Sequence, residues 1–345
     1  MRILVTGGAG FIGSNFIRYM LEKHDDVEIC NLDSLTYAGN LENLADVAGN
    51  SRYVFIKGDI ASEPEVMAVV EQHMPDVVVN FAAESHVDRS IHLGAGEFIR
   101  TNICGTQNLL DAARAAGTGR FVQISTDEVY GSAEEGSGFS EKTPLSPNNP
   151  YSATKASADL LVRAANKSYG LDTVITRCSN NFGPYQFPEK LIPLMVINAL
   201  QEKPLPIYGD GLHMRDWIFV SDHCSAIDLV MRKGRSGEVY NIGGTPDFSN
   251  LDIVRMILGS LGKPESLIQH IDDRPGHDRR YAMDYSKITA ELGWKPEHSF
   301  DEAMELSVKW YTDNRDWWRR VQEGSYREYY EKIYGLRMAE NRGKA

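Results

Sequence analysis

A glycine-rich stretch near the N-terminus most constrains the fold of this chain. The residues TGGAGFIGSN follow an apolar run, RILVT (2–6), and lead into an amphipathic helical pattern at 12–24. Gly7, Gly10 and Gly13 recur at three-residue spacing. Glycine permits a tight turn and lets the backbone approach a pyrophosphate, which then lies at the helix N-terminus. The stretch therefore predicts a strand–turn–helix unit that binds a dinucleotide.

Apolar runs and helical patterns alternate through the first half of the chain. The apolar runs are continuous, as in strands whose two faces are both covered. They lie at 2–6, 27–32, 53–57, 77–82, 121–125 and 173–177. Helical patterns lie between them, at 12–24, 63–74, 95–116 and 151–169. This alternation predicts an α/β protein with a Rossmann-type, doubly wound parallel sheet.

The composition changes after about residue 178, where SNNFGPYQFPEKLIP and KPLPIYGDG are rich in Pro, Gly, Asn and aromatic residues. Such segments are typical of binding loops. Further elements are predicted as helices at 188–202, 221–234, 249–261 and 300–333, and as a strand near 239–243. We expect an NAD-binding domain at 1–178, a smaller C-terminal α/β substrate domain at 179–335 that is partly interleaved with the first, and a polar tail at 336–345.

Charge and cysteine usage exclude several classes of function. The 345 residues carry a net charge of −12, which argues against nucleic acid because phosphate binding needs clustered Lys and Arg. The four cysteines, Cys30, Cys104, Cys178 and Cys224, include no Cys-x-x-Cys pair, so neither a zinc site nor a disulfide scaffold is indicated. We expect reduced thiols in a cytoplasmic protein with no bound metal. No apolar run approaches the length of a membrane span, and the glycines in the N-terminal stretch argue against a signal peptide.

Two acidic residues refine the cofactor prediction. Asp33 ends the second predicted strand, 20 residues after Gly13. An acid at this point accepts hydrogen bonds from a ribose 2′-OH and repels a 2′-phosphate, which favours NAD over NADP. For Asp33 alone, an ordinary turn acid would be the simpler interpretation. Asp59 follows the third strand and is a candidate for adenine contact, although a helix or turn cap fits its spacing equally well.

The segment NNPYSATKASADLL places Tyr151 and Lys155 four residues apart on one face of a helix that Pro150 begins. A phenol is a poor base near neutral pH because its usual pKa is about 10. A nearby ammonium group and a positive nicotinamide ring would favour the phenolate. The alternative is an aromatic residue on an ordinary amphipathic helix.

In STDEVYG, two neighbouring carboxylates, Asp127 and Glu128, come directly after a predicted buried strand. Like charges placed close together raise the pKa of one member, so the pair can supply one protonated and one ionised group. These residues are therefore candidates for a matched acid and base. A solvated pair of turn acids is the alternative.

The combination of TGGAGFIG, YSATK and the hydroxyl residues Ser125 and Thr126 resembles the extended short-chain dehydrogenase/reductase family. A more specific resemblance, to its nucleotide-sugar dehydratases, rests on STDEVYG, AAESHVDRS, RCSNNFGPYQFPEKLIP, RDWIFVSDH and DRPGHDRRYA. The typical motif has Tyr where Phe182 stands here. The resemblance covers nearly the whole chain.

The resemblance implies an NAD-dependent lyase that converts dTDP-glucose to a 4-keto-6-deoxy sugar. Tyr151 would remove a proton from the sugar hydroxyl, Lys155 would hold the nicotinamide ribose, and Thr126 would bind the C4 oxygen region. Oxidation at C4 makes the C5 proton acidic, because that carbon then lies next to a carbonyl. Loss of water across C5 and C6 needs a base, expected to be Glu128, and an acid, expected to be protonated Asp127.

The fingerprint and the resemblance together predict two sets of binding residues. The cofactor set is Gly7, Gly10, Phe11, Ile12, Gly13, Asp33, Leu35, Thr36, Asp59, Ile60, Ala82, Ala83, Tyr151, Lys155 and Asn181. The substrate set is Glu84, Ser85, Thr126, Asn180, Lys190, Leu191, Pro206, Tyr208, Arg215, Asn250, Arg274, His277 and Tyr281. Lys190, Arg215 and Arg274 are candidates to meet the phosphates. Taken singly, each charged residue is more often a solvated surface group, and His277 is more often a hydrogen-bonding residue of a loop.

Several alternatives remain open at this stage. The preference for thymidine comes from the resemblance alone, so UDP- and CDP-glucose are possible substrates. A nucleotide-sugar 4-epimerase would use the same NAD, Tyr151 and Lys155, and a non-catalytic NAD-binding scaffold would need neither residue. His86, Asp88 and Arg89 either organise a loop or touch substrate. The helices at 95–116 and 151–169 are expected to form a four-helix interface in a homodimer, although they could simply cover the sheet.

Overall fold

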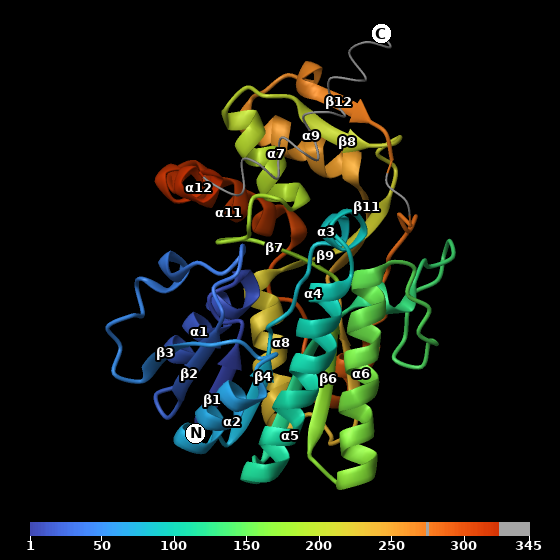
Figure 1. Ribbon diagram of the computed structural model, residues 1–345. Coiled ribbons are helices and arrows are strands. Elements are labelled where there is room, and N and C mark those ends of the chain that lie inside the picture. The colour runs from blue at the N-terminus through green and yellow to red at the C-terminus, as the bar shows by residue number, and fades with distance from the viewer. Residues whose placement is uncertain (274–275, 324–345) are drawn as a thin grey trace.

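The computed structural model describes residues 1–273 and 276–323 and is built around a seven-stranded parallel sheet (Figure 1). The strand order is β10-β6-β5-β4-β1-β2-β3, with every neighbouring pair parallel. The strands are β1 (Arg2–Thr6), β2 (Glu28–Asp33), β3 (Tyr53–Lys57), β4 (Val77–Asn80), β5 (Arg120–Thr126), β6 (Thr173–Cys178) and β10 (Val239–Ile242). The predicted Rossmann-type sheet is therefore confirmed, including all six strands expected in the first half.

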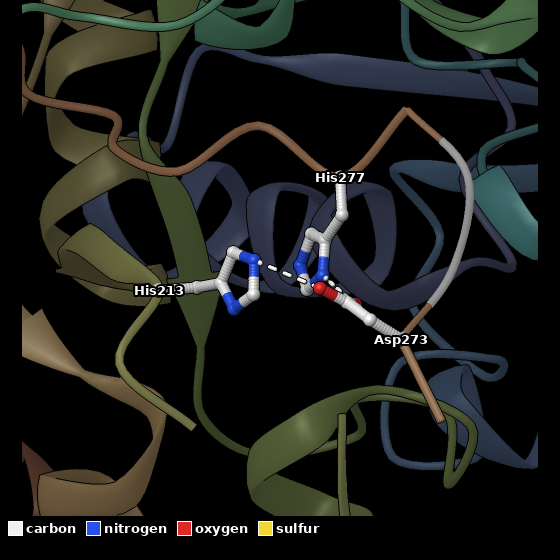
Figure 2. A group of neighbouring side chains, drawn as sticks. All are labelled: His213, Asp273 and His277. Carbon is white, nitrogen blue, oxygen red and sulfur yellow. Dashed lines mark hydrogen bonds and ion pairs between the residues drawn. The ribbon is translucent and has the colours of Figure 1, made fainter. Parts of the chain in front are cut away.

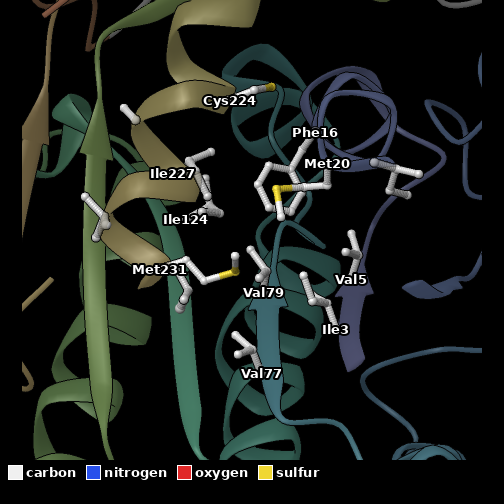
Figure 3. Packing of buried hydrophobic residues seen from close by; sticks show 14 of the residues in the cluster. Ile3, Val5, Phe16, Met20, Val77, Val79, Ile124, Cys224, Ile227 and Met231 are labelled. Carbon is white, nitrogen blue, oxygen red and sulfur yellow. The ribbon is translucent and has the colours of Figure 1, made fainter. Parts of the chain in front are cut away.

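Helices cover both faces of this sheet. On one face α1 (Phe11–Lys23) packs against α8 (Val220–Lys233), and on the other α2 (Glu63–His73), α5 (Thr106–Ala116) and α6 (Pro150–Tyr169) lie side by side. Figure 3 shows the first of these cores, where Phe16 of α1 and Ile227 of α8 are both fully buried. Because side chains alternate along a strand, the buried residues of β1, β2, β4, β5 and β6 serve both cores, which explains their continuous apolar runs. The edge strand β3 has no buried residue.

Local signals account for the helix carrying the Tyr-x-x-x-Lys pattern. Asn149 precedes α6, and its side-chain oxygen accepts a hydrogen bond from the backbone N–H of Ser152 at 2.9 Å. Pro150 occupies the first turn, where its missing N–H costs nothing, and Gly170 ends the helix with a φ of +69°. The stretch predicted as one helix at 95–116 instead comprises α4 (Gly96–Phe98), a π-helical turn η2 (Ile99–Gly105) and α5.

The C-terminal half forms a second layer above the sheet in Figure 1. Its strands are β7 (Asn180–Phe182), β9 (Met214–Phe219) and β11 (Thr245–Ser249) in one small sheet, with β8 (Leu205–Tyr208) and β12 (Ile268–Ile271) in another. Its helices are α7 (Leu191–Leu200), α9 (Asn250–Leu261), α11 (Phe300–Asp313) and α12 (Arg315–Gln322). An aromatic-rich core joins them around Phe182, Trp217 and Tyr311. The five short strands were not predicted, because their backbone pairing leaves little periodicity in segments rich in Pro, Gly and Asn.

The remaining described elements are short connectors. They are α3 (Val87–His92), α10 (Ser286–Leu292) and the 3-10 turns η1 (Leu41–Leu44), η3 (Asp127–Tyr130) and η4 (Glu265–Leu267). The helix predicted at 300–333 is interrupted at Asn314, and its part after residue 323 lies outside the described residues, as does the predicted tail. Within the described ranges, no helix is both long and apolar enough to span a membrane.

The chain returns to the main sheet after residue 178. Strand β10 pairs with β6, and α8 contributes Ile227 and Met231 to the core around α1 (Figure 3). Both elements lie in the segment predicted to be mostly substrate domain and partly interleaved with the first. The division at residue 178 stays a prediction, whereas the packing of these two elements on the first half is direct.

We expect Ile227→Ala to lower the free energy of unfolding by about 2–5 kcal/mol, because it removes a fully buried side chain from the core between α1 and α8. Leu306→Ala is the matched control, since Leu306 is 46% exposed and its truncation should change stability by less than about 0.5 kcal/mol. Urea denaturation followed by circular dichroism measures both. Equal effects of the two variants would show that α8 is not part of a tightly packed core.

Candidate active site

Most of the predicted site residues converge on one cavity of about 340 Å³ at the carboxyl edge of the main sheet. The cavity lies where the strand order reverses between β1 and β4, the usual ligand position in such sheets. The predicted residues that line it are Gly7, Gly10, Phe11, Ile12, Gly13, Asp33, Thr36, Asp59, Ile60, Ala82, Ala83, Glu84, Ser85, Thr126, Asp127, Glu128, Tyr151, Lys155, Asn180, Asn181 and Lys190. A larger cavity, of about 700 Å³ between α6 and β10, contains none of them.

The glycine turn fits a dinucleotide for steric reasons. A Cβ atom on Gly7, whose φ is +69°, would lie 2.6 Å from the backbone nitrogen of Ala82. A Cβ atom on Gly13 would lie 2.5 Å from the carbonyl oxygen of Gly7. The turn can therefore press against the end of β4 and against α1 only without side chains. Gly10 caps α1 without a side-chain hydrogen bond, which leaves the first-turn N–H groups available to a phosphate.

Asp33, the last residue of β2, stabilises the glycine turn. Its carboxylate accepts hydrogen bonds from the backbone N–H groups of Ala9, at 2.9 Å, and Leu35, at 2.8 Å. Burial raises the pKa of Asp33, and the two N–H donors oppose that rise. Leu35 itself does not line the cavity. Asp59 forms an ion pair with Arg100, and its carboxylate accepts a hydrogen bond from the Ala61 N–H. It therefore acts as a turn cap, and its contact with adenine stays a prediction.

Tyr151 and Lys155 face the cavity from α6. The Lys155 ammonium donates to the carbonyl oxygen of Ile124 at 2.6 Å, and burial lowers its pKa. Burial, followed by the charges of Glu128, Cys178 and Asp127, raises the pKa of Tyr151 well above its usual value. The expected lowering of the phenol pKa by Lys155 is therefore not found within the protein itself, because burial and the carboxylates outweigh the ammonium.

The carboxylate pair turns inward where β5 ends. The Thr126 hydroxyl accepts from the Glu128 N–H and donates to Asp127 Oδ1, both at 3.2 Å, which begins the turn η3. Asp127 is 2% exposed. Burial, then the neighbouring charges of Glu128 and Asp216, raise the pKa of Asp127 well above its usual range. These surroundings therefore favour the protonated form of Asp127, and the alternative of a solvated turn acid does not describe its burial.

Two residues that the sequence analysis did not assign orient Glu128. Its Oε2 atom accepts a hydrogen bond from the Ser152 hydroxyl at 3.1 Å and one from the Asn149 amide at 3.4 Å. Both donors come from the first turn of α6, the helix that carries Tyr151. The only sequence signal was their position beside that tyrosine.

Asp216 is a further residue that the sequence analysis missed. It lies fully buried in β9 and accepts from the backbone N–H groups of Gly244, at 2.9 Å, and Met283, at 3.1 Å. Burial raises its pKa to about 6. It belongs to the segment RDWIFVSDH, whose importance was visible only through the resemblance, because a lone Asp in a buried strand has no periodic signature.

The predicted substrate residues fall into two groups. Glu84, Ser85, Asn180 and Lys190 line the cavity, and the Lys190 ammonium donates to the Ser85 carbonyl oxygen at 3.0 Å. Seven others lie on the C-terminal half outside that lining: Leu191, Pro206, Tyr208, Arg215, Asn250, His277 and Tyr281. Arg274 lies outside the described residues.

Within the second group, Arg215 and Tyr281 interact electrostatically with the Asp127–Glu128 pair. The Arg215 guanidinium lies 4.4 Å from the centre of the Tyr281 ring. Burial and then the charge of Glu128 raise the pKa of Tyr281 well above its usual value, while Arg215 opposes the rise in the pKa of Asp127. These two residues therefore lie close to the carboxylate pair although they do not line the main cavity.

Figure 2 shows His213, Asp273 and His277, whose potential metal-binding atoms are close together. His213 Nε2 lies 3.3 Å and His277 Nδ1 2.7 Å from the Asp273 carboxylate. The two imidazole rings are stacked, with centres 3.6 Å apart and planes inclined by 13°. A metal ion lies near the plane of each imidazole that binds it, so two parallel rings at this spacing cannot share one ion without turning. In this geometry Asp273 instead bridges the two histidines.

Residues of the segment HVDRS contact other segments of the protein. The Tyr208 hydroxyl donates to Asp88 at 3.0 Å, and Arg89 pairs with Glu189 at 3.2 Å. His86 is buried. These contacts support the interpretation that the segment organises a loop.

Tyr151 and Lys155 beside a glycine turn on a doubly wound sheet define an extended short-chain dehydrogenase/reductase. The Asp127–Glu128 pair lies next to them in the same cavity. A family model described as GDP-mannose 4,6 dehydratase matches residues 4–306. The chain belongs to this family.

Individual relatives show how the similarity is distributed. A dTDP-glucose 4,6-dehydratase from Xanthomonas campestris pv. campestris (strain B100) is 52% identical over 342 residues, 94% of this chain and 97% of the relative. The crystal structure of DesIV, a dTDP-glucose 4,6-dehydratase from Streptomyces venezuelae, matches with a TM-score of 0.90 and 50% identity over 93% of this chain and 100% of that one. A UDP-glucose 4-epimerase from Thermotoga maritima has a TM-score of 0.85 but 29% identity, over 91% and 100% of the two chains.

We expect the stability of Asp127→Asn, relative to that of the wild type, to increase as the pH rises above about 4, the usual pKa of an aspartate. The unfolded chain ionises Asp127 near its usual pKa of about 3.9, whereas burial and the neighbouring charges raise the pKa of Asp127 in the folded chain. Wild-type stability is therefore lost as the pH rises toward the raised pKa, by about 1.4 kcal/mol for each pH unit, and Asn does not titrate. Thermal unfolding of both proteins across this pH range measures the difference. A difference independent of pH would contradict a raised pKa of Asp127 in the folded chain.

Proposed function

We propose that the chain is an NAD-dependent hydro-lyase that converts dTDP-glucose to dTDP-4-keto-6-deoxyglucose. The observation that carries this proposal is the Asp127–Glu128 pair beside Tyr151, in the cavity that the glycine turn borders, with Asp127 buried and Glu128 partly exposed. Relatives about 50% identical over nearly the whole chain are named for this activity, and DesIV was crystallised with NAD. The more distant epimerase shares the fold, so the fold alone would not distinguish the two reactions.

The cofactor residues follow from the geometry. Gly7, Gly10 and Gly13 would carry the pyrophosphate at the N-terminus of α1, and Asp33 would face the adenosine ribose. Lys155 would hold the nicotinamide ribose. When bound, NAD takes hydride from C4 of the sugar and returns it to C6, so the overall reaction leaves the cofactor unchanged.

Oxidation at C4 requires a base for the hydroxyl proton. Tyr151 has this role in our proposal, and α6 places it in the cavity beside Thr126, at the end of β5. Burial disfavours the phenolate in the protein itself. The positive charge of the oxidised nicotinamide ring would favour it, which couples proton removal to the presence of the oxidised cofactor.

Elimination needs an acid and a base on one side of the sugar. Asp127, whose pKa is raised by burial and then by the charges of Glu128 and Asp216, would protonate the departing C6 hydroxyl. Glu128, held by Ser152 and Asn149, would remove the C5 proton. The two neighbouring residues thus take opposite roles because their surroundings differ.

The nucleotide end of the substrate would lie on the C-terminal half. Lys190 and Arg215 supply cations there, and Tyr208 and Tyr281 supply aromatic and hydroxyl surface. The nucleobase preference for thymidine is supported by the relatives' names. UDP- and CDP-glucose are the alternative substrates.

We also propose a homodimer formed through helices at 95–116 and 150–169. Its support is the exposure of large apolar side chains on these helices, with Ile99 47% and Leu160 56% exposed. A single-chain mass in light scattering would contradict it. A cytoplasmic location is consistent with the four cysteines, which are all free thiols.

Incubation with dTDP-glucose should give a 4-keto-6-deoxy product with no net NADH, because the electrons taken from C4 return to C6. Mass spectrometry identifies the product by its loss of water, and absorbance at the NADH band follows the cofactor. Formation of dTDP-galactose alone would assign the chain to the epimerases. A mixture with UDP- and CDP-glucose in the same assay tests the nucleobase preference.

Glu128→Gln should retain oxidation at C4, visible as enzyme-bound NADH, but lose exchange of the C5 proton with solvent. Turnover should fall by about 10²–10⁴-fold, the usual contribution of one general base. Glu134→Gln is the control, because Glu134 is an exposed carboxylate of the following loop. Wild-type exchange in Glu128→Gln would remove Glu128 from this role.

A further inference from the structure

Three side chains beside the cofactor cavity have no role in the chemistry above. The Arg89 guanidinium lies 3.7 Å from the centre of the Tyr37 ring, and its Nε atom lies 3.2 Å from Glu189 Oε2. The charge of the same carboxylate contributes to raising the pKa of Tyr37, whose main cause is burial. We refer to Arg89, Tyr37 and Glu189 as the Arg89 clasp. They come from three separate segments: α3, the loop 34–40 after β2, and the loop 183–190 before α7.

Both loops joined by the clasp form walls of the cavity. The first contributes Ser34, Thr36, Ala38 and Gly39, and the second contributes Gln186, Phe187, Glu189 and Lys190. The loops also meet directly, since the Tyr37 and Phe187 rings are in edge contact with centres 5.6 Å apart. Separation of the two walls would therefore break the clasp and this ring contact together.

The clasp is largely withdrawn from water, which makes its charges costly to separate. The Glu189 side chain is 1% exposed and that of Arg89 is 15% exposed. A cation–π contact and an ion pair both strengthen when desolvated, and removal of one partner leaves the other charge buried. By contrast, Arg114 makes similar contacts with Asp111 and Tyr169 on the surface, where its side chain is 51% exposed.

The proposed reaction creates a need for such a device. Between oxidation at C4 and reduction at C6, the electrons of the sugar are held by the cofactor. If the reduced cofactor dissociated at this stage, C6 of the sugar could not be reduced. The protein would also lack the oxidised cofactor that it needs for the next turnover. A dehydratase of this kind must therefore release its cofactor much more slowly than it turns over.

We propose that the Arg89 clasp holds loops 34–40 and 183–190 together over the dinucleotide and slows its release. Arg89 is then a positioning residue, since it acts through Tyr37 and Glu189 and does not line the cavity. The proposal rests on the proposed function for the need to retain the reduced cofactor. The contacts that carry it are independent of the sugar.

The short helix α3 also contacts the C-terminal half of the chain. Asp88, next to Arg89, accepts a hydrogen bond from Tyr208 at 3.0 Å, and Lys190, next to Glu189, donates to Ser85 at 3.0 Å. Helix α3 thus connects the cofactor walls to β8. The segment HVDRS is therefore held by contacts with the walls of the cavity and with β8.

The test measures release of NADH from the protein without any sugar. Each protein is loaded with NADH, excess NAD is added, and the loss of protein-bound NADH fluorescence gives the dissociation rate. Arg89→Met, which keeps the length of the side chain but removes its charge, should release NADH about tenfold faster or more. Arg89→Lys should be intermediate, because it keeps the cation without the planar group. Arg114→Met, the matched control, should release NADH at the wild-type rate.

Tyr37→Leu provides a second test, since it removes the ring and hydroxyl but leaves the Arg89–Glu189 pair. It should also accelerate release, and it decides the question if Arg89→Met does not fold, as judged by circular dichroism of the cofactor-free proteins. Wild-type release from a folded Arg89→Met or, in its place, Tyr37→Leu would overturn the proposal, as would equal acceleration in Arg114→Met. Because no sugar is present, failure of the dehydratase assay would leave this result intact, and the two proposals can fail separately.

Discussion

Removal of water from the Asp127 carboxyl is the physical constraint on which the proposed chemistry depends. Asp127 and Glu128 are adjacent in sequence, yet their surroundings differ. Asp127 is buried, and burial, followed by the charges of Glu128 and Asp216, raises its pKa. Glu128 lies against hydrogen-bond donors from Ser152 and Asn149. A single strand end thereby supplies both an acid and a base, as elimination requires.

Helix α6 fixes the positions of these groups relative to one another. Its N-cap residue Asn149 and its first-turn residue Ser152 hold Glu128, and Tyr151 lies between them in the sequence. One turn later, Lys155 is tied to the β5 carbonyl of Ile124. Because all four residues belong to one capped helix packed on the sheet, the acid–base pair and the proposed phenol base cannot move independently. The C-terminal half then closes the site by bringing Asp216 and Arg215 to the same strand end.

The main sheet was predictable because its strands carry strong local signals. Continuous apolar runs, a glycine turn and a capped helix depend on neighbouring residues, so β1 to β6 and α6 were expected from the chain alone. The short strands β7, β8, β9, β11 and β12 were not, because they are stabilised by partners distant in sequence and by an aromatic core. The strand near 239–243 was expected, but its place beside β6 was not, since pairing between distant segments leaves no periodic pattern.

The amino-acid sequence by itself determined the dinucleotide turn, the Tyr151–Lys155 helix and the position of the carboxylate pair at a strand end. These features depend on residue type and spacing, which are properties of short segments. Only the tertiary structure decided which carboxyl is buried with a raised pKa, which residues orient the other, and how Arg89 joins two loops beside the cavity. Burial, hydrogen bonding and charge pairing of this kind arise when distant segments exclude water from one another, and no short segment contains that information.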